Sequence, residues 1–218
     1  EVNRERDHYV DRAAVAAILA KCDTQWRLTL ALCRFAGLRC PSEVTGLLGS
    51  DIHWEEKRIR IDSQKTGLRF CPIFPELLPF LDEAWDAAPE GASRLVTHRG
   101  RESNLRTQLK RIVESAGLCF WPKPFVNLRA SCRTDLEERY PAHVCDAWLG
   151  HSTKVARKHY LQVTEAHWER ATTESDPKHV ELPATANSPG AHPGPISAVP
   201  EPTALDAALE GLPSECHA

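Results

Sequence analysis

The sequence predicts a mainly α-helical domain that carries one small antiparallel β-hairpin or sheet, an α+β arrangement. Apolar residues recur at helical spacing over most of the first 172 residues, as expected for amphipathic helices that pack around a common core. Residues 57–61 instead alternate charged and apolar side chains, and a polar turn at residues 63–67 separates them from a second extended stretch. Two such stretches around a short turn are typical of a hairpin.

Two helices are expected in the first 40 residues. The apolar residues of the first fall at positions 15, 18, 19 and 22, and those of the second at positions 28, 32, 35 and 36. Asp23 is suited to cap the second helix, and Gly37 is suited to end it. Ser42 is expected to cap a further short helix that has Glu43 at its start.

The later helices follow the hairpin, whose second strand is expected at residues 68–74. One helix is predicted from Pro75 through Trp85, and another over the apolar positions between 105 and 116, where Gly117 ends it. Three more helices are predicted at residues 125–139, 142–149 and 153–161.

The composition changes near Glu174. Residues 173–218 contain half of the sixteen prolines, and they carry seven acidic residues against one lysine. Such a segment is expected to be a disordered tail, so that residues 1–172 form the domain. That domain carries a net charge of +3 although the whole chain carries −3, which is compatible with a nucleic-acid partner. Because the chain contains no methionine, we also expect that a further N-terminal segment precedes it.

The eight cysteines form no Cys-x-x-Cys pair, which argues against a zinc site. Several fall on apolar faces of the predicted helices, so we expect buried, reduced thiols, with disulfides or a metal site as the alternatives. No stretch approaches the roughly 18 apolar residues of a membrane span, and no signal peptide is recognisable. These features are typical of a cytoplasmic protein.

Five residues form a candidate set for cleaving a phosphodiester. Arg39 and Arg129 can hold phosphate oxygens with their guanidinium groups, and His151 can do so from the turn after Gly150. Lys65, in the predicted hairpin turn, can protonate a leaving oxygen. Tyr160 is a poor nucleophile at its free pKa of about 10, but it can attack a phosphodiester whose charge is neutralised by fixed cations. The set predicts DNA strand cleavage through a phosphotyrosine.

Each of these residues also has an ordinary structural interpretation. Arg39 and Glu43 can form an ordinary ion pair on the surface, without a role in phosphate binding. Arg133 lies one helical turn after Arg129 and can take its place. Tyr160 can pack at the edge of the domain.

The ordered motifs resemble those of the catalytic domain of tyrosine recombinases, also called phage-type integrases. GLRCPSEV resembles the segment with the family's first arginine, QKTG the hairpin lysine, VNLRA the second arginine, and LGHSTKVARKHY the histidine and tyrosine nine residues apart. The resemblance covers about residues 10–170. This sequence departs from the family pattern at two positions. Val126 stands where the family usually has histidine, and Ala130 stands where the family frequently has histidine. The resemblance also implies that the segment expected before this chain is a separate core-binding domain.

The resemblance implies the fold of that domain and a site-specific recombinase or integrase. Such an enzyme cuts and rejoins DNA through a 3′-phosphotyrosine without metal, cofactor or ATP. The resemblance implies that Arg39, Arg129 and His151 hold the scissile phosphate, that Lys65 is the general acid and that Tyr160 is the nucleophile. Glu43 holds Arg39 in place, and valine at position 126 is expected to alter the rate of DNA cleavage.

The resemblance also implies partners and a setting. The expected partner is double-stranded DNA with a specific site. A homotetramer is expected on two duplexes, and a weak oligomer or a monomer is expected without DNA. No membrane association is expected. A role in a mobile element, and association with the nucleoid of a bacterium, would follow. Trp168 is a candidate anchor on a neighbouring subunit or, equally, part of the chain's own core.

Three other functions stay open at this point. The chain can be a non-catalytic DNA-binding protein on the same fold, with Val126 as a sign of lost activity. It can be an enzyme like the type IB topoisomerases, which also use a tyrosine nucleophile. It can finally be a helical protein-interaction module in which the motifs coincide by chance.

Overall fold

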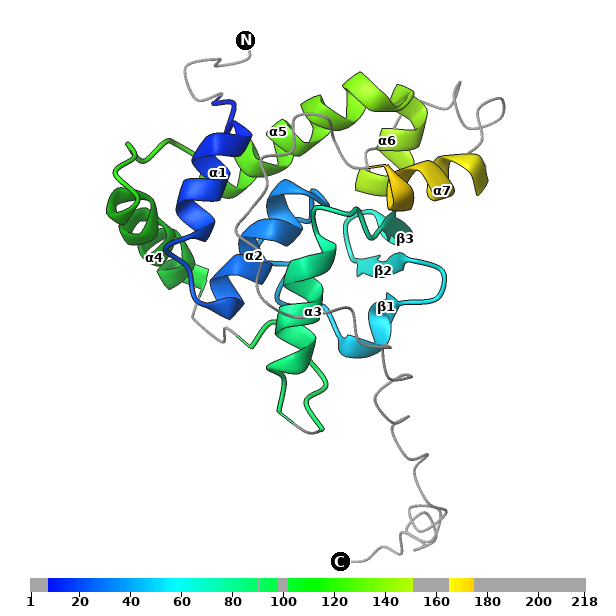
Figure 1. Ribbon diagram of the computed structural model, residues 1–218, viewed down its shortest axis with the longest axis horizontal. Coiled ribbons are helices and arrows are strands. Elements are labelled where there is room, and N and C mark those ends of the chain that lie inside the picture. Colours follow the sequence, from blue (N-terminus) through cyan, green and yellow to red (C-terminus); the bar gives the residue numbers. More distant parts are fainter. Residues whose placement is uncertain (1–7, 90, 98–101, 151–164, 175–218) are drawn as a thin grey trace, which may run out of the picture.

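The computed structural model describes residues 8–89, 91–97, 102–150 and 165–174, and within them helices surround one side of a small antiparallel sheet (Figure 1). This confirms the predicted fold class. The helices are α1 (Arg12–Leu19), α2 (Thr24–Arg34), α3 (Leu78–Asp86), α4 (Glu102–Ser115), α5 (Pro124–Arg139), α6 (Ala142–Leu149) and α7 (Glu165–Thr173), with a 3₁₀ turn η2 (Gly49–Asp51). The strands are β1 (Ile52–His53), β2 (Arg58–Ser63) and β3 (Gly67–Pro72).

The first two helices begin where a side chain can satisfy their free N–H groups. Asp11 accepts a hydrogen bond from the backbone of Ala14, and Asp23 accepts one from the backbone of Trp26 at 2.8 Å. Such caps typically contribute about 1 kcal/mol. The turn after α2 contains Gly37 with φ of +62°, a conformation that glycine adopts without steric cost.

The sheet has the strand order β1-β2-β3, and each neighbouring pair is antiparallel. Ile59 pairs with Cys71, and Ile61 pairs with Arg69. These four side chains are buried, because alternate residues of a strand face the same side of a sheet. The other face of the sheet carries Leu68 and Phe70 of β3, whose side chains are exposed.

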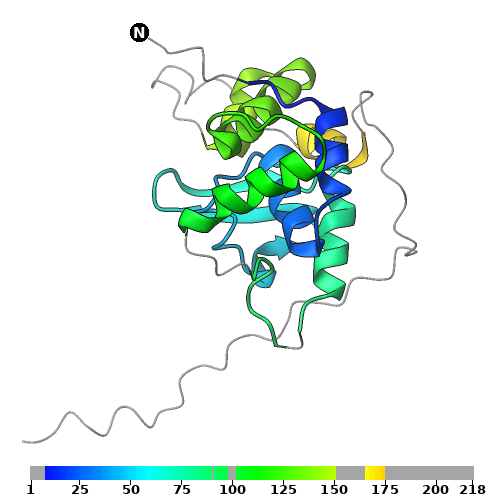
Figure 2. The ribbon, with the colours of Figure 1, turned by 90° about the vertical axis from the view of Figure 1, so that its left-hand side faces the viewer.

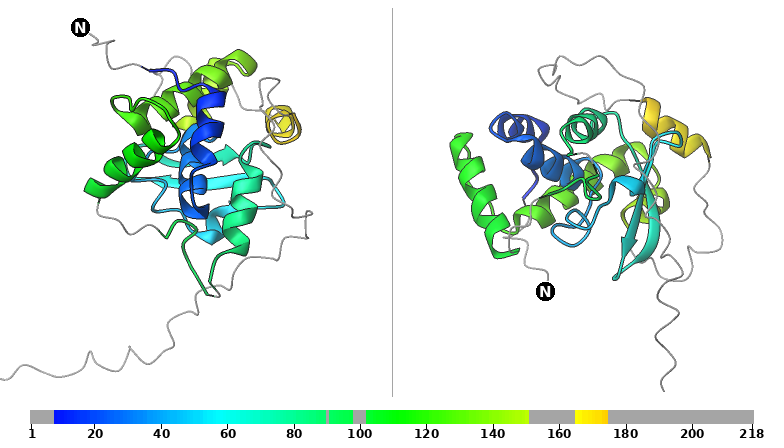
Figure 3. Two further views of the ribbon diagram at one scale, coloured as in Figure 1. Left: turned by 60° about the vertical axis from the view of Figure 1, so that its left-hand side comes forward. Right: turned by 90° about the horizontal axis from the view of Figure 1, so that it is seen from below.

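The sheet lies at one side of the helical body. Seen from below, α4 and the sheet stand at opposite ends, with α1, α2 and α3 between them (Figure 3). Viewed from the α4 side, α4 lies in front of α2 and the sheet (Figure 2). Helix α2 contacts both α3 and α5, and α6 and α7 both contact β3. The sheet is therefore attached to the helical body through α6 and α7.

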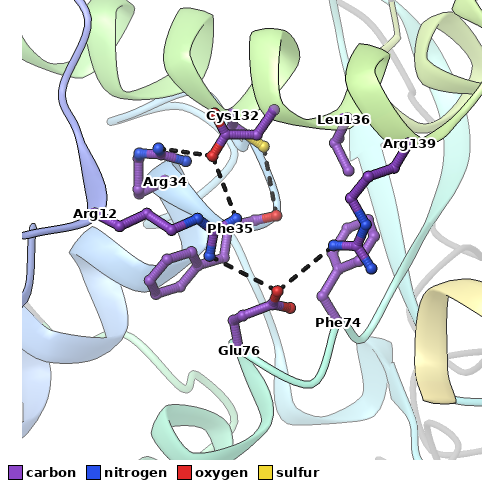
Figure 4. A pocket seen from close by; sticks show the side chains of 9 residues that line it. Arg12, Arg34, Phe35, Phe74, Glu76, Cys132, Leu136 and Arg139 are labelled. Carbon is purple, nitrogen blue, oxygen red and sulfur yellow. Dashed lines mark hydrogen bonds and ion pairs between the residues drawn. The ribbon is translucent and has the colours of Figure 1, made fainter. Parts of the chain in front are cut away.

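A buried ion-pair network joins the start of the described chain to α5 (Figure 4). Asp135 of α5 accepts from Arg34 at 2.8 Å and lies 3.2 Å from Arg12. Glu76 lies between Arg12 at 3.7 Å and Arg139 at 3.5 Å. Because each buried charge has an opposite partner, the network avoids the large cost of an isolated buried ion.

The structure differs from the sequence-based prediction in three elements. The short helix expected from Ser42 is instead a run of turns over residues 40–46, where Glu43 and Thr45 donate to the carbonyls of Arg39 and Pro41. Strand β1 and helix α7 were not predicted. The helix expected at residues 153–161 lies outside the described residues.

The cysteines of the described part are free thiols, and most of them are buried. Burial raises the pKa of Cys132 and of Cys22 to about 12, so both remain protonated at neutral pH. Within the described ranges, none of the helices combines the length and the apolar composition that crossing a membrane requires.

Candidate active site

The candidate site forms around the carboxylate of Glu43, which lies in the turns after α2. Only 1% of the Glu43 side-chain surface is exposed. Three arginines from separate parts of the chain approach this carboxylate: Arg39 from the same turns, Arg69 from β3 and Arg129 from α5. We call these four residues the Glu43 cluster.

Arg39 and Arg69 together hold both oxygens of Glu43. Arg39 donates from Nη1 to Oε1 at 2.7 Å and from its backbone N–H to Oε2 at 2.8 Å. Arg69 donates from Nη1 to Oε1 at 3.0 Å and from Nη2 to Oε2 at 2.7 Å. Burial alone would raise the pKa of Glu43, but the hydrogen bonds from Arg69 and Arg39 lower it to about 2. Glu43 is therefore ionised at neutral pH.

Arg129 lies beside this pair and binds two backbone carbonyls. Its Nη1 is 3.9 Å from Oε2 of Glu43 and donates to the carbonyl of Gly37, while Nη2 donates to the carbonyl of Leu149. Burial, helped by the charge of Arg39, lowers the pKa of Arg129 to about 10. Arg129 is thus cationic at neutral pH, and its orientation is set by the ends of α2 and α6.

Two glycine turns permit this close packing. Gly37 and Gly150 have φ of +62° and +67°. A Cβ atom on Gly37 would lie 2.7 Å from Cδ2 of Leu149, and one on Gly150 would lie 3.0 Å from both Arg69 Cδ and Thr66 Oγ1. Both turns therefore require glycine for conformation and for space.

The tip of the β2–β3 hairpin is tied to the cluster through Thr66. Its hydroxyl oxygen accepts from Nη1 of Arg39 at 3.4 Å and from Nη1 of Arg69 at 3.2 Å. Lys65 precedes Thr66 in the turn and is exposed. Arg39 also donates from Nη2 to the carbonyl of Gly150 at 3.1 Å. The structure thus brings the hairpin turn, Arg39 and the end of α6 together.

Three guanidinium groups against one carboxylate leave two net positive charges in this cluster. Arg39 is the most accessible of the three, with 23% of its side chain exposed, against 6% for Arg69 and 11% for Arg129. Guanidinium groups match the geometry of phosphate oxygens and remain charged at neutral pH. The cluster can therefore bind an anion at the edge where Arg39 is exposed.

The structure distinguishes between the two arginines of α5. Arg133 pairs with Asp146 at 2.5 Å and with Glu137 at 2.6 Å. Arg129, and not Arg133, lies beside Glu43. The pair of Arg39 with Glu43 is also not the surface ion pair that was one alternative, because the carboxylate is buried.

Val126 lies in the first turn of α5, and 60% of its surface is exposed. Its side chain can neither donate a hydrogen bond to a phosphate oxygen nor transfer a proton. This position, three residues before Arg129, thus presents an apolar group to solvent.

His151 and Tyr160 lie outside the described residues. The two other tyrosines lie within them. Tyr9 donates its hydroxyl to Oδ1 of Asp135 at 2.6 Å. Tyr140 is 2% exposed, and burial raises the pKa of its hydroxyl. Burial and the raised pKa make Tyr140 a poorer nucleophile than a solvent-accessible tyrosine.

Sequence reasoning missed Arg69. A signal was present, because the alternation of β3 places position 69 on the same side as Cys71, which is the buried side. A charged residue at a core-facing strand position requires a buried partner. That partner, Glu43, is separated from Arg69 by 26 residues, so periodicity could not identify it.

Among the residues that the structure describes, no group of three or more His, Cys, Asp and Glu side chains is placed to hold a metal ion. The Glu43 carboxylate is instead occupied by arginine hydrogen bonds.

No protein-family model and no curated protein matches the sequence. The structure resembles several solved ones, all of low sequence identity. A XerA recombinase matches with a TM-score of 0.58 and 18% identity over 75% of this chain and 63% of that one. The catalytic core of lambda integrase matches with a TM-score of 0.52 and 19% identity over 65% of this chain and 91% of the core.

A third similar structure is a lambda integrase tetramer bound to a Holliday junction, with a TM-score of 0.56 and 19% identity over 76% of this chain and 51% of that one. The chain spans less than two thirds of the length of the XerA recombinase but most of the lambda catalytic core. The likeness is therefore to the catalytic part of these proteins. This chain has the fold of the tyrosine recombinase and integrase catalytic domain.

Proposed function

We propose that this chain is the catalytic part of a site-specific DNA recombinase or integrase that uses Tyr160 as nucleophile. The observation that carries the proposal is the Glu43 cluster, in which Arg39 and Arg129 converge beside the hairpin turn that holds Lys65. The fold shared with recombinases and integrases supports it.

The proposed reaction begins when Arg39, Arg129 and His151 bind the non-bridging oxygens of the scissile phosphate. Their charges stabilise the pentavalent transition state, where electrostatic preorganisation contributes most to phosphoryl transfer. The Tyr160 oxygen forms a bond to phosphorus as its hydroxyl proton passes to solvent water. The bond between phosphorus and the 5′-oxygen breaks, and Lys65 protonates that oxygen.

The product is a 3′-phosphotyrosine and a free 5′-hydroxyl. Attack by the 5′-hydroxyl of a second strand reverses these steps and restores the phosphodiester. The phosphodiester energy is kept in the protein–DNA bond, so the cycle needs neither ATP nor a metal ion.

The proposed partner is double-stranded DNA that contains a specific site. Synapsis of two duplexes by a homotetramer is part of the same proposal, supported by the likeness to the lambda integrase tetramer on a Holliday junction. The proposal also places the protein in the cytoplasm, associated with the nucleoid. A type IB topoisomerase would relax supercoils without exchanging strands between two sites, which separates that function from this one.

The test uses a suicide duplex that contains the protein's own site, first isolated by selecting bound sequences from a random DNA pool. The duplex is nicked so that the 5′-hydroxyl fragment diffuses away after cleavage. We expect a covalent protein–DNA band on a denaturing gel with the wild type and none with Tyr160→Phe. Tyr9→Phe and Tyr140→Phe are the matched controls and should retain the band.

Two results of this experiment would contradict the proposal. DNA binding without a covalent band from the wild type would support the non-catalytic alternative, and a band that survives in Tyr160→Phe would exclude this tyrosine as nucleophile.

A further inference from the structure

We propose that Arg69 is a positioning residue, which occupies the Glu43 carboxylate so that Arg39 and Arg129 remain directed at the scissile phosphate. The inference rests on the proposed function. Arg69 does not itself contact the DNA in this proposal, because 6% of its side chain is exposed.

The hydrogen bonds of Arg69 account for all three nitrogens of its guanidinium group. Nη1 and Nη2 bind the two oxygens of Glu43, and Nε donates to the carbonyl of Trp148 at 2.9 Å. Nη1 also reaches the hydroxyl of Thr66. Arg69 thus joins the turn with Arg39, the hairpin turn after Lys65 and the end of α6.

Arg39 uses its guanidinium group differently. One nitrogen, Nη1, binds Oε1 of Glu43, whereas Nη2 binds the carbonyl of Gly150. This division leaves Arg39 partly exposed and turned toward the end of α6. This division depends on Arg69, because Arg69 donates hydrogen bonds to the lone pairs of Glu43 that Arg39 does not use. Without these hydrogen bonds the buried carboxylate would attract the nearest cations.

Loss of Arg69 would leave the Glu43 carboxylate buried and short of donors. The nearest replacements are Nη2 of Arg39 and Nη1 of Arg129, which already lies 3.9 Å from Oε2. Either movement withdraws a guanidinium group from the phosphate. The defect would therefore appear in the cleavage step, where small displacements are costly, more than in the binding of DNA, which many other contacts support.

The experiment compares Arg69→Gln and Arg69→Lys with the wild type in the suicide-duplex reaction at saturating protein, alongside DNA affinity. We expect Arg69→Gln to lower the cleavage rate constant about 100-fold, with a dissociation constant for DNA within about threefold of the wild type. Arg69→Lys should be intermediate, because an ammonium keeps the charge without the fork that spans both oxygens. Arg60→Gln, on the outer face of the same sheet, is the control and should cleave normally.

The double variant Arg69→Gln with Glu43→Gln separates positioning from folding. Without the carboxylate nothing draws Arg39 or Arg129 inward, so the double variant should cleave at least about tenfold faster than Arg69→Gln alone. A purely structural role predicts instead that the cleavage rates of the single and double variants follow their free energies of unfolding, which urea unfolding measures, whereas positioning predicts a gain in cleavage at equal stability. Cleavage by Arg69→Gln within threefold of the wild type, or a double variant no better than the single one, would overturn the proposal.

A crystal structure of Arg69→Gln tests the inference without any activity. Both terminal nitrogens of Arg39 should lie on Glu43, or Nη1 of Arg129 should have moved into contact with it, with the bond from Arg39 to the Gly150 carbonyl lost in the first case. Unchanged positions of both arginines would refute positioning. Absence of a covalent band from the wild type, by contrast, would refute the proposed function. The crystal structure of Arg69→Gln would still decide whether Arg69 positions the other two arginines.

Discussion

At the scale of single residues, Glu43 is the group on which the site depends. It carries no proposed chemistry, yet it contacts all three arginines of the cluster. Its burial is tolerated because hydrogen bonds from Arg69 and Arg39 replace the lost water. Removal of the carboxylate would leave three guanidinium groups in mutual repulsion.

The lowered pKa of Glu43 predicts how stability depends on pH. A carboxyl whose pKa falls from an ordinary 4.5 to about 2 on folding stabilises the native state above pH 4.5, and that contribution is lost as the pH falls to 2. Two and a half pKa units correspond to roughly 3 kcal/mol. Urea unfolding of the wild type and Glu43→Gln should show their difference shrinking by this order between pH 5 and pH 2.

The control for this titration is Glu56→Gln, since the Glu56 side chain is 58% exposed. A wild-type advantage over Glu43→Gln that is independent of pH would mean that the arginines do not hold Glu43 ionised.

Gly150 allows a second residue-scale prediction. Alanine at this position would adopt a positive φ and bring its Cβ within 3.0 Å of Arg69 and Thr66. We expect Gly150→Ala to lower the free energy of unfolding by about 3 kcal/mol. Gly91→Ala is matched in φ, at +78°, but has nothing within 4 Å, so it should cost only about 1 kcal/mol of backbone strain. Equal losses in urea unfolding would show that the close contact at Gly150 is unimportant.

At the scale of elements, α7 packs on the chain's own α6 and sheet. The Trp168 ring lies 5.6 Å from the ring of Trp148, and the guanidinium of Arg58 lies 4.1 Å from the centre of the Trp168 ring. Ala171 is fully buried. Of the two roles expected for Trp168, the structure therefore shows the intramolecular one.

The packing of α7 predicts a measurable contribution from Trp168. We expect Trp168→Ala to lower the free energy of unfolding by about 2 kcal/mol, through lost burial and lost cation–π contact. A double-mutant cycle with Arg58→Ala should give a coupling of about 0.5–1 kcal/mol. Thr173→Ala, at the end of the same helix, is the control. A change within 0.5 kcal/mol for Trp168→Ala would mean that α7 is only loosely attached in solution.

The helices and the hairpin were predictable because their signals are local. The Asp23 cap, the apolar spacing of α2 and the alternation of β2 each lie within a dozen residues. The turns at residues 40–46 were mistaken for a helix because Ser42 and Glu43 resemble a helix start, whereas Pro41 and Gly46 flank the segment too closely for a regular helix to continue. Helix α7 was missed because the last helix was expected to end at residue 161, and no further helix was predicted in the rest of the domain.

At the scale of the whole molecule, charge is unevenly distributed along the chain. The net charge of −3 combines a basic part before residue 173 with an acidic tail. Because phosphate contacts dominate affinity for DNA, the tail opposes binding electrostatically. The division at residues 172 and 173 remains a prediction, and the last described helix ends at Thr173.

A chain that ends after Glu174 tests this division. We expect it to keep the unfolding free energy of the full chain and to bind DNA about threefold more tightly at low salt, with the difference vanishing at high salt. Fluorescence anisotropy over a salt series, with urea unfolding beside it, measures both. Weaker binding by the shortened chain would assign the tail a contact with DNA, and a lost folding transition would place it in the domain.

The sequence by itself determined the helices α1 to α6, the hairpin and the order of the motif residues, because these follow from periodicity and turn chemistry over short distances. Only the tertiary structure decided which of the α5 arginines meets Glu43, that the Arg39 pair is buried and that Arg69 completes the cluster. The contacts of Glu43 with Arg69 and with Arg129 join residues that are 26 and more than 80 positions apart in the sequence. They arise when α2, β3, α5 and α6 pack on one core and two glycine turns allow their ends to approach, which no local pattern specifies.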